Sequence, residues 1–164
     1  MPRAYISLGS NIDRESNTRA GVAALQQAYG PLQLSSVYES KAVGFEGDSF
    51  FNMVIGFDTD EDVQQLARHL RKIEEDHGRE RHGVKFSSRT LDLDLLLYDD
   101  LVLESPSLSL PRDEILKYAF VLWPLAEIAP ETIHPLEHLS YAELWQAFDT
   151  STLDLHPVAF DVQD

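Results

Sequence analysis

The sequence predicts an α+β fold in which helices pack against one antiparallel sheet. Four segments have the apolar runs or the alternation of strands, and two have the apolar spacing of amphipathic helices. They occur in the order strand, helix, strand, strand, helix, strand, which is the split βαβ, or ferredoxin-like, pattern. We therefore expect a ferredoxin-like βαββαβ core with both helices on one face, so that the other face is free for a site or for C-terminal helices.

The first part of the chain supplies three of the strands and one helix. Residues 4–8 are a short apolar run that ends at a Gly-Ser-Asn turn signal. Residues 16–29 carry alanines and a leucine on one helical stripe, and the Gly-Pro pair that follows stops the helix. Strands are expected at residues 32–39 and 50–57, and the loop of residues 40–49 between them contains two glycines.

The clearest helix is expected at residues 59–77. Its apolar stripe at helical spacing consists of Val63, Leu66, Ala67, Leu70 and Ile73. Thr59 and Asp62 resemble a capping box at its start, and Gly78 ends it. A polar, basic loop at residues 79–88 then leads to the central strand.

The central strand lies within residues 88–100 and carries two aspartates on one face. Successive strand side chains face opposite sides. One face is therefore predicted to carry Leu91, Leu93, Leu95 and Leu97, and the other Asp92, Asp94, Leu96 and Tyr98. Two aspartates roughly 6.6 Å apart along a strand can hold one hard cation between them, or two cations about 3.5–4 Å apart. The plain alternative is a solvated strand end, where acidic residues are common.

The C-terminal part is predicted to be mostly helical. Residues 113–129 form a helical segment that Pro124 kinks or divides. Residues 140–148 form a short helix with Ser140 and Glu143 as its cap. An edge strand after this helix is indicated by the alternation of Val158, Phe160 and Val162.

Length and composition indicate a single globular domain over residues 1–164, because 43% of the residues are apolar and no repeat or linker divides the chain. The absence of cysteine excludes a disulfide framework and a thiolate metal site, and suits a reducing compartment. No segment resembles a signal peptide or a membrane span. We therefore expect a cytoplasmic protein with no membrane partner and no obligate protein partner.

The charge distribution suggests what the protein binds. A net charge of −15 argues against nucleic-acid binding, which depends on lysine and arginine meeting phosphates. Seven of the 13 basic residues nevertheless fall in one segment: Arg68, Arg71, Lys72, Arg79, Arg81, Lys85 and Arg89. Because this segment leads directly into the two aspartates, we expect an anion site beside a cation site. That combination fits a metal-bound polyphosphate.

Several motifs together resemble one known family. The hexapeptide Arg89-Thr90-Leu91-Asp92-Leu93-Asp94 resembles the signature of the 6-hydroxymethyl-7,8-dihydropterin pyrophosphokinases, also called 2-amino-4-hydroxy-6-hydroxymethyldihydropteridine diphosphokinases. The resemblance runs from about residue 3 to residue 148. Further matching motifs, in the expected order, are Leu8-Gly9-Ser10-Asn11, Phe51-Asn52, Ile73-Glu74, Gly78-Arg79, Ala119-Phe120-Val121-Leu122, Pro124-Leu125 and Glu127-Ile128-Ala129-Pro130.

The resemblance implies a fold, a reaction and a metal. The fold would be a three-layer α/β/α arrangement with additional C-terminal helices. The reaction would transfer pyrophosphate from ATP to the hydroxymethyl group of the pterin, with release of AMP, in folate biosynthesis. Asp92 and Asp94 would bind two magnesium ions, and ATP would be the co-substrate. Chemistry of this kind depends on in-line positioning and charge neutralisation.

The resemblance also assigns roles to individual residues. Arg79 and Arg89 would clamp the triphosphate as fork-shaped donors and act with Asp92 and Asp94 in catalysis. The positions that match the pterin site are Ser40, Val43, Phe50, Asn52 and Phe120. The positions assigned to ATP are Arg79, Arg81, Lys85, Phe86, Arg89, Leu95, Ser109 and Arg112. The loops of residues 40–49 and 79–88 match two loops that close over substrate.

The chain departs from the family pattern at four places. Phe86-Ser87-Ser88 replaces a tryptophan and a Gly-Pro pair, and Lys41-Ala42 replaces a proline-containing stretch. Arg112 stands where a histidine is usual, and Tyr118 where an arginine is usual. We predict that Arg112 supplies the phosphate contact that position 118 has lost. The alternative is a surface arginine paired weakly with its two acidic neighbours.

Other interpretations remain open from the sequence alone. A homologue that keeps the pocket but has lost efficient transfer would act as a pterin or nucleotide binding protein. A ferredoxin-like nucleic-acid or regulatory module is disfavoured by the net charge and the acid pair. Phe50 and Phe120 could be ordinary core aromatics, and Asn11 could serve only its turn.

Overall fold

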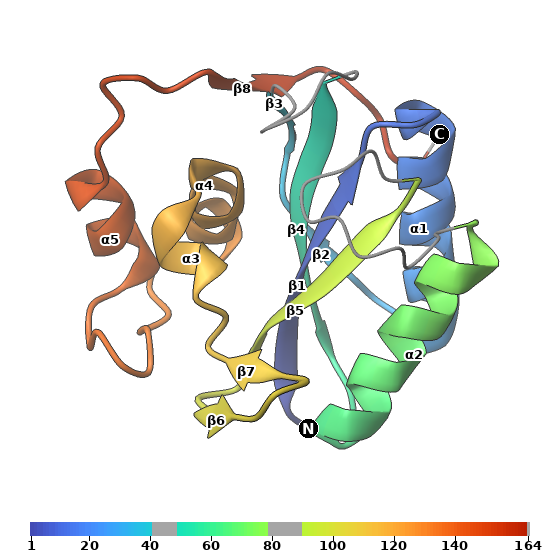
Figure 1. The fold of residues 1–164 in the computed structure, drawn as a ribbon, viewed down its shortest axis with the longest axis horizontal. Coiled ribbons are helices and arrows are strands. Elements are labelled where there is room, and N and C mark those ends of the chain that lie inside the picture. Colours follow the sequence, from blue (N-terminus) through green and yellow to red (C-terminus); the bar gives the residue numbers. More distant parts are fainter. Residues whose placement is uncertain (41–48, 79–89, 164) are drawn as a thin grey trace.

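The computed structural model describes residues 1–40, 49–78 and 90–163. Its main sheet is antiparallel, with strands in the order β5-β1-β4-β3-β8 and the short β2 paired to β4 (Figure 1). The strands are β1 (Arg3–Ser10), β2 (Gln33–Leu34), β3 (Val37–Ser40), β4 (Phe50–Asp58), β5 (Asp92–Tyr98), β6 (Leu103–Glu104), β7 (Ser109–Leu110) and β8 (Leu155–Val158). The helices are α1 (Arg14–Tyr29), α2 (Val63–Asp76), α3 (Glu114–Lys117), α4 (Ala119–Ile128) and α5 (Tyr141–Ala147). The chain is therefore α+β, as predicted.

Helices cover both faces of the main sheet (Figure 1). One face, which we call the α1–α2 face, packs under α1 and α2 through a core that includes Leu8 and Met53. The other, which we call the α4 face, carries α3, α4 and α5 over a second core that includes Val54 and Leu122. The C-terminal helices thus occupy the face that the sequence left free for them or for a site. The predicted loops at residues 40–49 and 79–88 fall mainly outside the described residues.

A β-bulge interrupts the pairing of β1 with β5. Tyr5 pairs with Leu97 and Ile6 with Leu95, which leaves Leu96 as the extra residue. Beyond the bulge the predicted alternation is wrong: Leu97 joins Leu96 in the core of the α4 face, and the tyrosine that ends β5 packs against the core of the α1–α2 face. The faces exchange there because a bulge sets two residues against one. The two aspartates at the start of β5 precede the bulge and keep their predicted side.

The single strand predicted at residues 32–39 is divided into β2 and β3. Ser35 and Ser36 separate them, and two of the hydrogen bonds of Ser35 go to Val54 of β4. The Ser35 N–H donates to the Val54 carbonyl at 3.0 Å, and the Ser35 Oγ accepts from the Val54 N–H at 2.8 Å. The hydroxyl therefore replaces a backbone carbonyl in the ladder, which ends β2 before β3 begins.

Helix α2 has the predicted apolar stripe but a different cap. The helix begins at Val63, and Asp62 is its N-cap: the Asp62 carboxylate accepts from the Gln65 N–H, and the Gln65 side chain accepts from the Asp62 N–H. The predicted cap at Thr59 is wrong, because Thr59 is buried and its hydroxyl accepts from Glu61. The stripe is confirmed by the buried Leu66, Leu70 and Ile73.

The C-terminal helical segment divides at Tyr118 rather than at Pro124. Tyr118 has an extended backbone that separates α3 from α4, and Pro124 lies inside α4. Pro124 forfeits one helical hydrogen bond, but it is buried between Leu122 and Leu125, so tertiary packing holds the helix through it. The cap predicted for α5 is confirmed by reciprocal bonds between Ser140 and Glu143. No helix in the described ranges is long and apolar enough to cross a membrane.

A strand is present at the predicted end of the chain, but it is β8 (Leu155–Val158), so of the three alternating residues only Val158 belongs to it. Phe160 and Val162 lie beyond the strand and pack against the core of the α1–α2 face. β8 pairs antiparallel with β3 at the outer edge of the main sheet. The chain that follows packs against α1: the Arg19 guanidinium lies 4.5 Å from the centre of the Phe160 ring, and its Nε donates to the Asp161 carbonyl at 3.0 Å. Phe160 also lies against Phe51 of β4. The C-terminal segment thus ties the sheet edge to α1 (Figure 1).

Candidate active site

Three carboxylates converge at the start of β5. Asp92 and Asp94 come from one face of β5 and Glu74 from the end of α2, and one oxygen of each lies within 4.8 Å of the others. Glu74 is only 4% exposed, and its Oε2 accepts a 2.7 Å hydrogen bond from the Leu93 N–H. Because β5 ends the sheet on this side, that N–H faces outward toward α2. We call Glu74, Asp92 and Asp94 the acidic cluster.

The acidic cluster is an unfavourable place for a carboxylate without a cation. Burial, followed by the charge of Asp92, raises the pKa of Asp94 to about 7. Glu114 and Glu74 add to this effect, whereas Arg112 opposes it. A divalent cation would remove the repulsion, and carboxylate oxygens are the ligands that hard divalent cations take. Both the donor set and the charge of the cluster therefore fit magnesium.

Arg112 lies beside the acidic cluster. Its Nη2 is 3.5 Å from Asp94 Oδ1, its Nε donates to Glu114 Oε1 at 3.0 Å, and its backbone N–H donates to the Leu96 carbonyl at 3.0 Å. The pairing predicted with Glu114 is thus present, but Asp113 pairs with Lys117 instead. Arg112 is therefore part of the cluster's surroundings and not a plain surface residue. Its contact with phosphate stays a prediction.

A second group of site residues surrounds Asn52 on the α4 face. Asn52 is 7% exposed, and its Nδ2 donates to Ser40 Oγ at 2.8 Å, which joins two positions predicted for the pterin. Gly9 of β1 pairs with Asn52. A Cβ on Gly9 would lie 3.7 Å from Asn52 Oδ1 and 3.8 Å from the Phe50 ring. The missing side chain of Gly9 thus leaves room beside the amide oxygen and the aromatic ring.

Phe120 reaches the same face from α4. It is half-buried, and its ring stacks on Tyr118 with the ring centres 5.0 Å apart and the planes at 16°. Helix α4 is held on the sheet by Glu127, whose carboxylate accepts from the Ser36 N–H, the Ser36 hydroxyl and the Tyr38 hydroxyl. These bonds fix the helix that carries Phe120 relative to β3.

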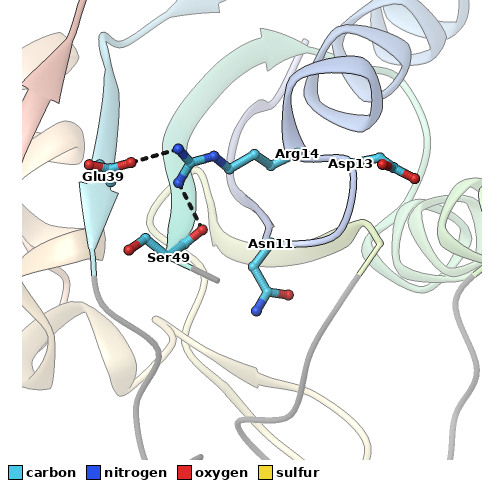
Figure 2. Close-up of a pocket in the computed structure, with 5 residues that line it drawn as sticks. All are labelled: Asn11, Asp13, Arg14, Glu39 and Ser49. Atoms are coloured by element: carbon cyan, nitrogen blue, oxygen red, sulfur yellow. Dashed lines mark hydrogen bonds and ion pairs between the residues drawn. The ribbon is translucent and has the colours of Figure 1, made fainter. Parts of the chain in front are cut away.

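A polar cavity of about 410 Å³ lies where β1, β3 and β4 meet the start of α1 (Figure 2). Its lining residues are Asn11, Asp13, Arg14, Glu39 and Ser49. Arg14 Nη2 pairs with Glu39 Oε2 at 2.7 Å, and Nη1 donates to the Ser49 carbonyl at 2.9 Å. Arg14 thereby ties the first turn of α1 to β3 and to the residue just before β4. The residues of this cavity are not among the predicted site positions.

The remaining predicted site residues fall into two groups. Arg79, Arg81, Lys85, Phe86, Arg89 and Val43 lie outside the described residues. Leu95 is a buried core residue of the α1–α2 face, on the opposite side of β5 from Asp94, and Ser109 is exposed on β7. The structure therefore does not bring the side chains of Leu95 and Ser109 to the acidic cluster, and their ATP contacts stay predictions.

The sequence reasoning missed two residues of this site. Glu74 enters the sequence-based prediction only as part of the matching motif Ile73-Glu74, although a glutamate on the apolar stripe of α2 signals a buried acid with a partner. Glu127 belongs to the matching motif Glu127-Ile128-Ala129-Pro130, and its role as the anchor of α4 depends on contacts with β3 that no local pattern reveals.

Comparisons with known proteins agree on one family. The sequence model of the 7,8-dihydro-6-hydroxymethylpterin-pyrophosphokinase (HPPK) family matches residues 5–130. A 2-amino-4-hydroxy-6-hydroxymethyldihydropteridine pyrophosphokinase of Aquifex aeolicus is 37% identical over 138 residues, which cover 83% of this chain and 86% of the relative. The protein of the same name from Bacillus subtilis is 40% identical over 132 residues, which cover 78% of each chain.

Solved structures show the same fold at much lower identity. A Plasmodium falciparum HPPK-DHPS structure with pteroate has a TM-score of 0.70 and 13% identity. The match covers 88% of this chain and 42% of that chain, so this chain spans less than half the length of the HPPK-DHPS protein. A second structure, of wild-type HPPK-DHPS from the same organism, has a TM-score of 0.67 and 14% identity. At these identities the likeness shows the fold alone.

Proposed function

The chain belongs to the 7,8-dihydro-6-hydroxymethylpterin-pyrophosphokinase family, and we propose that its acidic cluster and the face around Asn52 divide the family reaction between them. The chain is an ATP-dependent pyrophosphokinase of folate synthesis, which transfers pyrophosphate to the hydroxymethyl group of 6-hydroxymethyl-7,8-dihydropterin. In this proposal the acidic cluster binds the magnesium and phosphates of ATP, and the α4 face around Asn52 binds the pterin.

The acidic cluster is the proposed magnesium site. Asp92 and Asp94 are the proposed ligands, for two ions as the family resemblance implies, and Glu74 is the third carboxylate within reach. Magnesium bound there supplies charge neutralisation for the triphosphate. Glu74 also fixes the start of β5 through the Leu93 N–H, so the carboxylates are already oriented before a cation arrives. This support from a buried hydrogen bond favours the cluster over a solvated strand end.

The face around Asn52 is the proposed pterin site. Asn52 presents its amide oxygen into the room left by Gly9, while its Nδ2 is held by Ser40. That arrangement suits an acceptor that reads N–H groups on the polar edge of the ring. Phe50 and Phe120 are the proposed aromatic walls, because both are half-buried on the α4 face. Val43 is added from the family resemblance.

The triphosphate contacts are proposed from the family resemblance. Arg79 and Arg89 are proposed to bind the triphosphate, and the further contacts on the same segment are Arg81, Lys85 and Phe86. Arg112, which lies beside Asp94, is a further proposed phosphate contact. We also propose that β1, α1, β3, β4, α2 and β5 form a ferredoxin-like core within one domain over residues 1–164. The order of these elements, the strand order β5-β1-β4-β3 and the packing of α1 and α2 on one face support it (Figure 1).

The observation that carries the metal proposal is the convergence of three carboxylates, and substitution of the aspartates tests it. Asp92→Asn or Asp94→Asn should lower AMP formation from ATP and the pterin by at least about 100-fold, because each removes a charge from a site that works by neutralisation. Asp100→Asn, exposed in the turn that follows β5, is the matched control. AMP formation at the control rate in either cluster variant would refute the aspartate site. AMP absent in the wild type would indicate a homologue that only binds.

A further inference from the structure

Arg112 pairs with Asp94, a proposed magnesium ligand, and its guanidinium is also a group that binds phosphate. Its guanidinium spans two acids, with Nη2 3.5 Å from Asp94 and Nε 3.0 Å from Glu114. Its backbone is fixed by the carbonyl of Leu96, the extra residue of the β-bulge. The bulge residue therefore fixes the backbone of Arg112 against β5 at a point two residues beyond Asp94.

The two contacts of the guanidinium differ in strength. The bond to Glu114 has hydrogen-bond length, whereas the contact with Asp94 is longer and joins through the outer nitrogen. The Nε bond can therefore persist while the outer nitrogens turn to another partner. The Arg112 side chain is 30% exposed, so part of it is accessible to a ligand.

A cation at the acidic cluster changes the balance at Asp94. The guanidinium and a divalent cation repel each other if both use the same carboxylate, so Arg112 weakens cation binding as long as it stays there. A triphosphate offers the guanidinium a stronger, two-pronged partner than one carboxylate oxygen. Arriving phosphate can thus draw Arg112 away from Asp94 at the moment when the cation needs the carboxylate.

We propose that Arg112 couples cation loading to nucleotide binding by exchanging partners between Asp94 and the triphosphate. Without nucleotide, Arg112 is the counter-ion of Asp94 and holds the affinity for divalent cations down. With nucleotide, it contacts phosphate and releases Asp94 to the cation. The inference rests on the proposed function, because it takes the acidic cluster to be the metal site. Such coupling between two ligands is reciprocal, with a typical size of 5–150-fold.

Two binding measurements on the 164-residue chain test the exchange. The first titrates Mn²⁺ into nucleotide-free protein and follows free Mn²⁺ by electron paramagnetic resonance. The second titrates α,β-methylene-ATP with EDTA present and follows tryptophan fluorescence. In Arg112→Gln, we expect Mn²⁺ to bind about ten-fold more tightly and the nucleotide analogue about ten-fold more weakly. A purely structural role would weaken both, so the opposite signs identify the exchange.

The matched control is Lys117→Gln, which removes one positive charge from the same segment. Lys117 pairs with Asp113 at 2.9 Å, away from the cluster, and both affinities should stay at wild-type values. Arg112→Lys, which keeps the charge without the fork, guards against misfolding of the glutamine variant. It should keep Mn²⁺ affinity near wild type and weaken the analogue.

Each outcome decides between the proposals. Unchanged or weakened Mn²⁺ binding in Arg112→Gln, while Asp94→Asn loses Mn²⁺, overturns the exchange and leaves the metal site standing. Wild-type Mn²⁺ binding in Asp94→Asn refutes the metal site of the proposed function, and the exchange with it. Unchanged analogue binding in Arg112→Gln also overturns the exchange, because Arg112 would then have no phosphate partner.

Discussion

Glu74 has two separable roles, which two substitutions should distinguish. Its buried carboxylate accepts the outward-facing Leu93 N–H at 2.7 Å and also belongs to the acidic cluster. Glu74→Ala removes both the acceptor and the charge. Glu74→Gln keeps an oxygen that can accept the same bond and removes only the charge. Stability without metal should therefore report the hydrogen bond, and the response to metal should report the charge.

The size of each effect follows from the contact. A hydrogen bond to a charged group contributes about 1.5–3 kcal/mol, and Glu74→Ala leaves the Leu93 N–H buried without its partner. At about 2–4 °C per kcal/mol for a domain of this size, its Tm without metal should fall by roughly 3–12 °C. Glu74→Gln should change Tm by about 2 °C or less, because loss of repulsion from Asp92 and Asp94 offsets a weaker bond.

Thermal unfolding with and without magnesium is the assay. Wild-type protein should gain about 2.7 kcal/mol of stability at a magnesium concentration 100 times the Kd, and both Glu74 variants should lose most of that gain. Glu75→Gln, an exposed neighbour on α2, is the control that should behave as wild type. If Glu74→Gln destabilises the metal-free protein as much as Glu74→Ala, the hydrogen bond is not the source of the loss. If Glu74→Gln keeps the full magnesium response, Glu74 is not part of the metal site.

Two further substitutions address the pterin side and the pH response. Asn52→Ala should raise the Kd for the pterin at least as much as it lowers the rate, because in the proposed site the amide would contact the substrate in every state; pterin affinity equal to that of wild type, measured by calorimetry, would exclude Asn52 from the pocket. Because the pKa of Asp94 rises from 3.8 to about 7 on folding, the folded metal-free protein holds this proton more tightly than the unfolded chain. Asp94 should therefore make stability fall as pH rises from about 4 to 7, and Asp94→Asn should flatten that part of a urea-denaturation series; an unaltered pH profile would contradict the shift.

The local sequence pattern predicts the two site residues that lie on one strand. It does not predict the residue that joins them from another part of the chain. Alternation from Leu91 placed Asp92 and Asp94 on one side, because nothing interrupts β5 before the bulge at Leu96. Glu74 joins them from another element, and only the position of α2 against the edge of β5 brings it within reach. A spacing rule applied to one segment cannot reveal a contact of that kind.

The bulge shows the same limit within a single strand. Residues 95–97 are three leucines, with no glycine, proline or polar residue among them to mark where the pairing slips, so simple alternation assigns Leu97 to the wrong face. The slip is fixed by β1, whose Tyr5 and Ile6 meet Leu97 and Leu95. The predicted α+β class and order of the elements are correct, because they depend on the chain as a whole and not on the register of one strand.

The pairing of β8 with β3 has a consequence for how the chain is made. β3 (Val37–Ser40) lies early in the sequence, yet its outer edge pairs with β8 (Leu155–Val158), the last of the described strands. Until β8 has been synthesised, the outer edge of β3 therefore has a row of unpaired backbone groups, and such an edge promotes association between nascent chains. Once β8 docks, the new outer edge contains Pro157, which has no N–H to offer a neighbouring strand. Pairing with β8 thus closes this edge of the sheet only after the chain has been synthesised through residue 158.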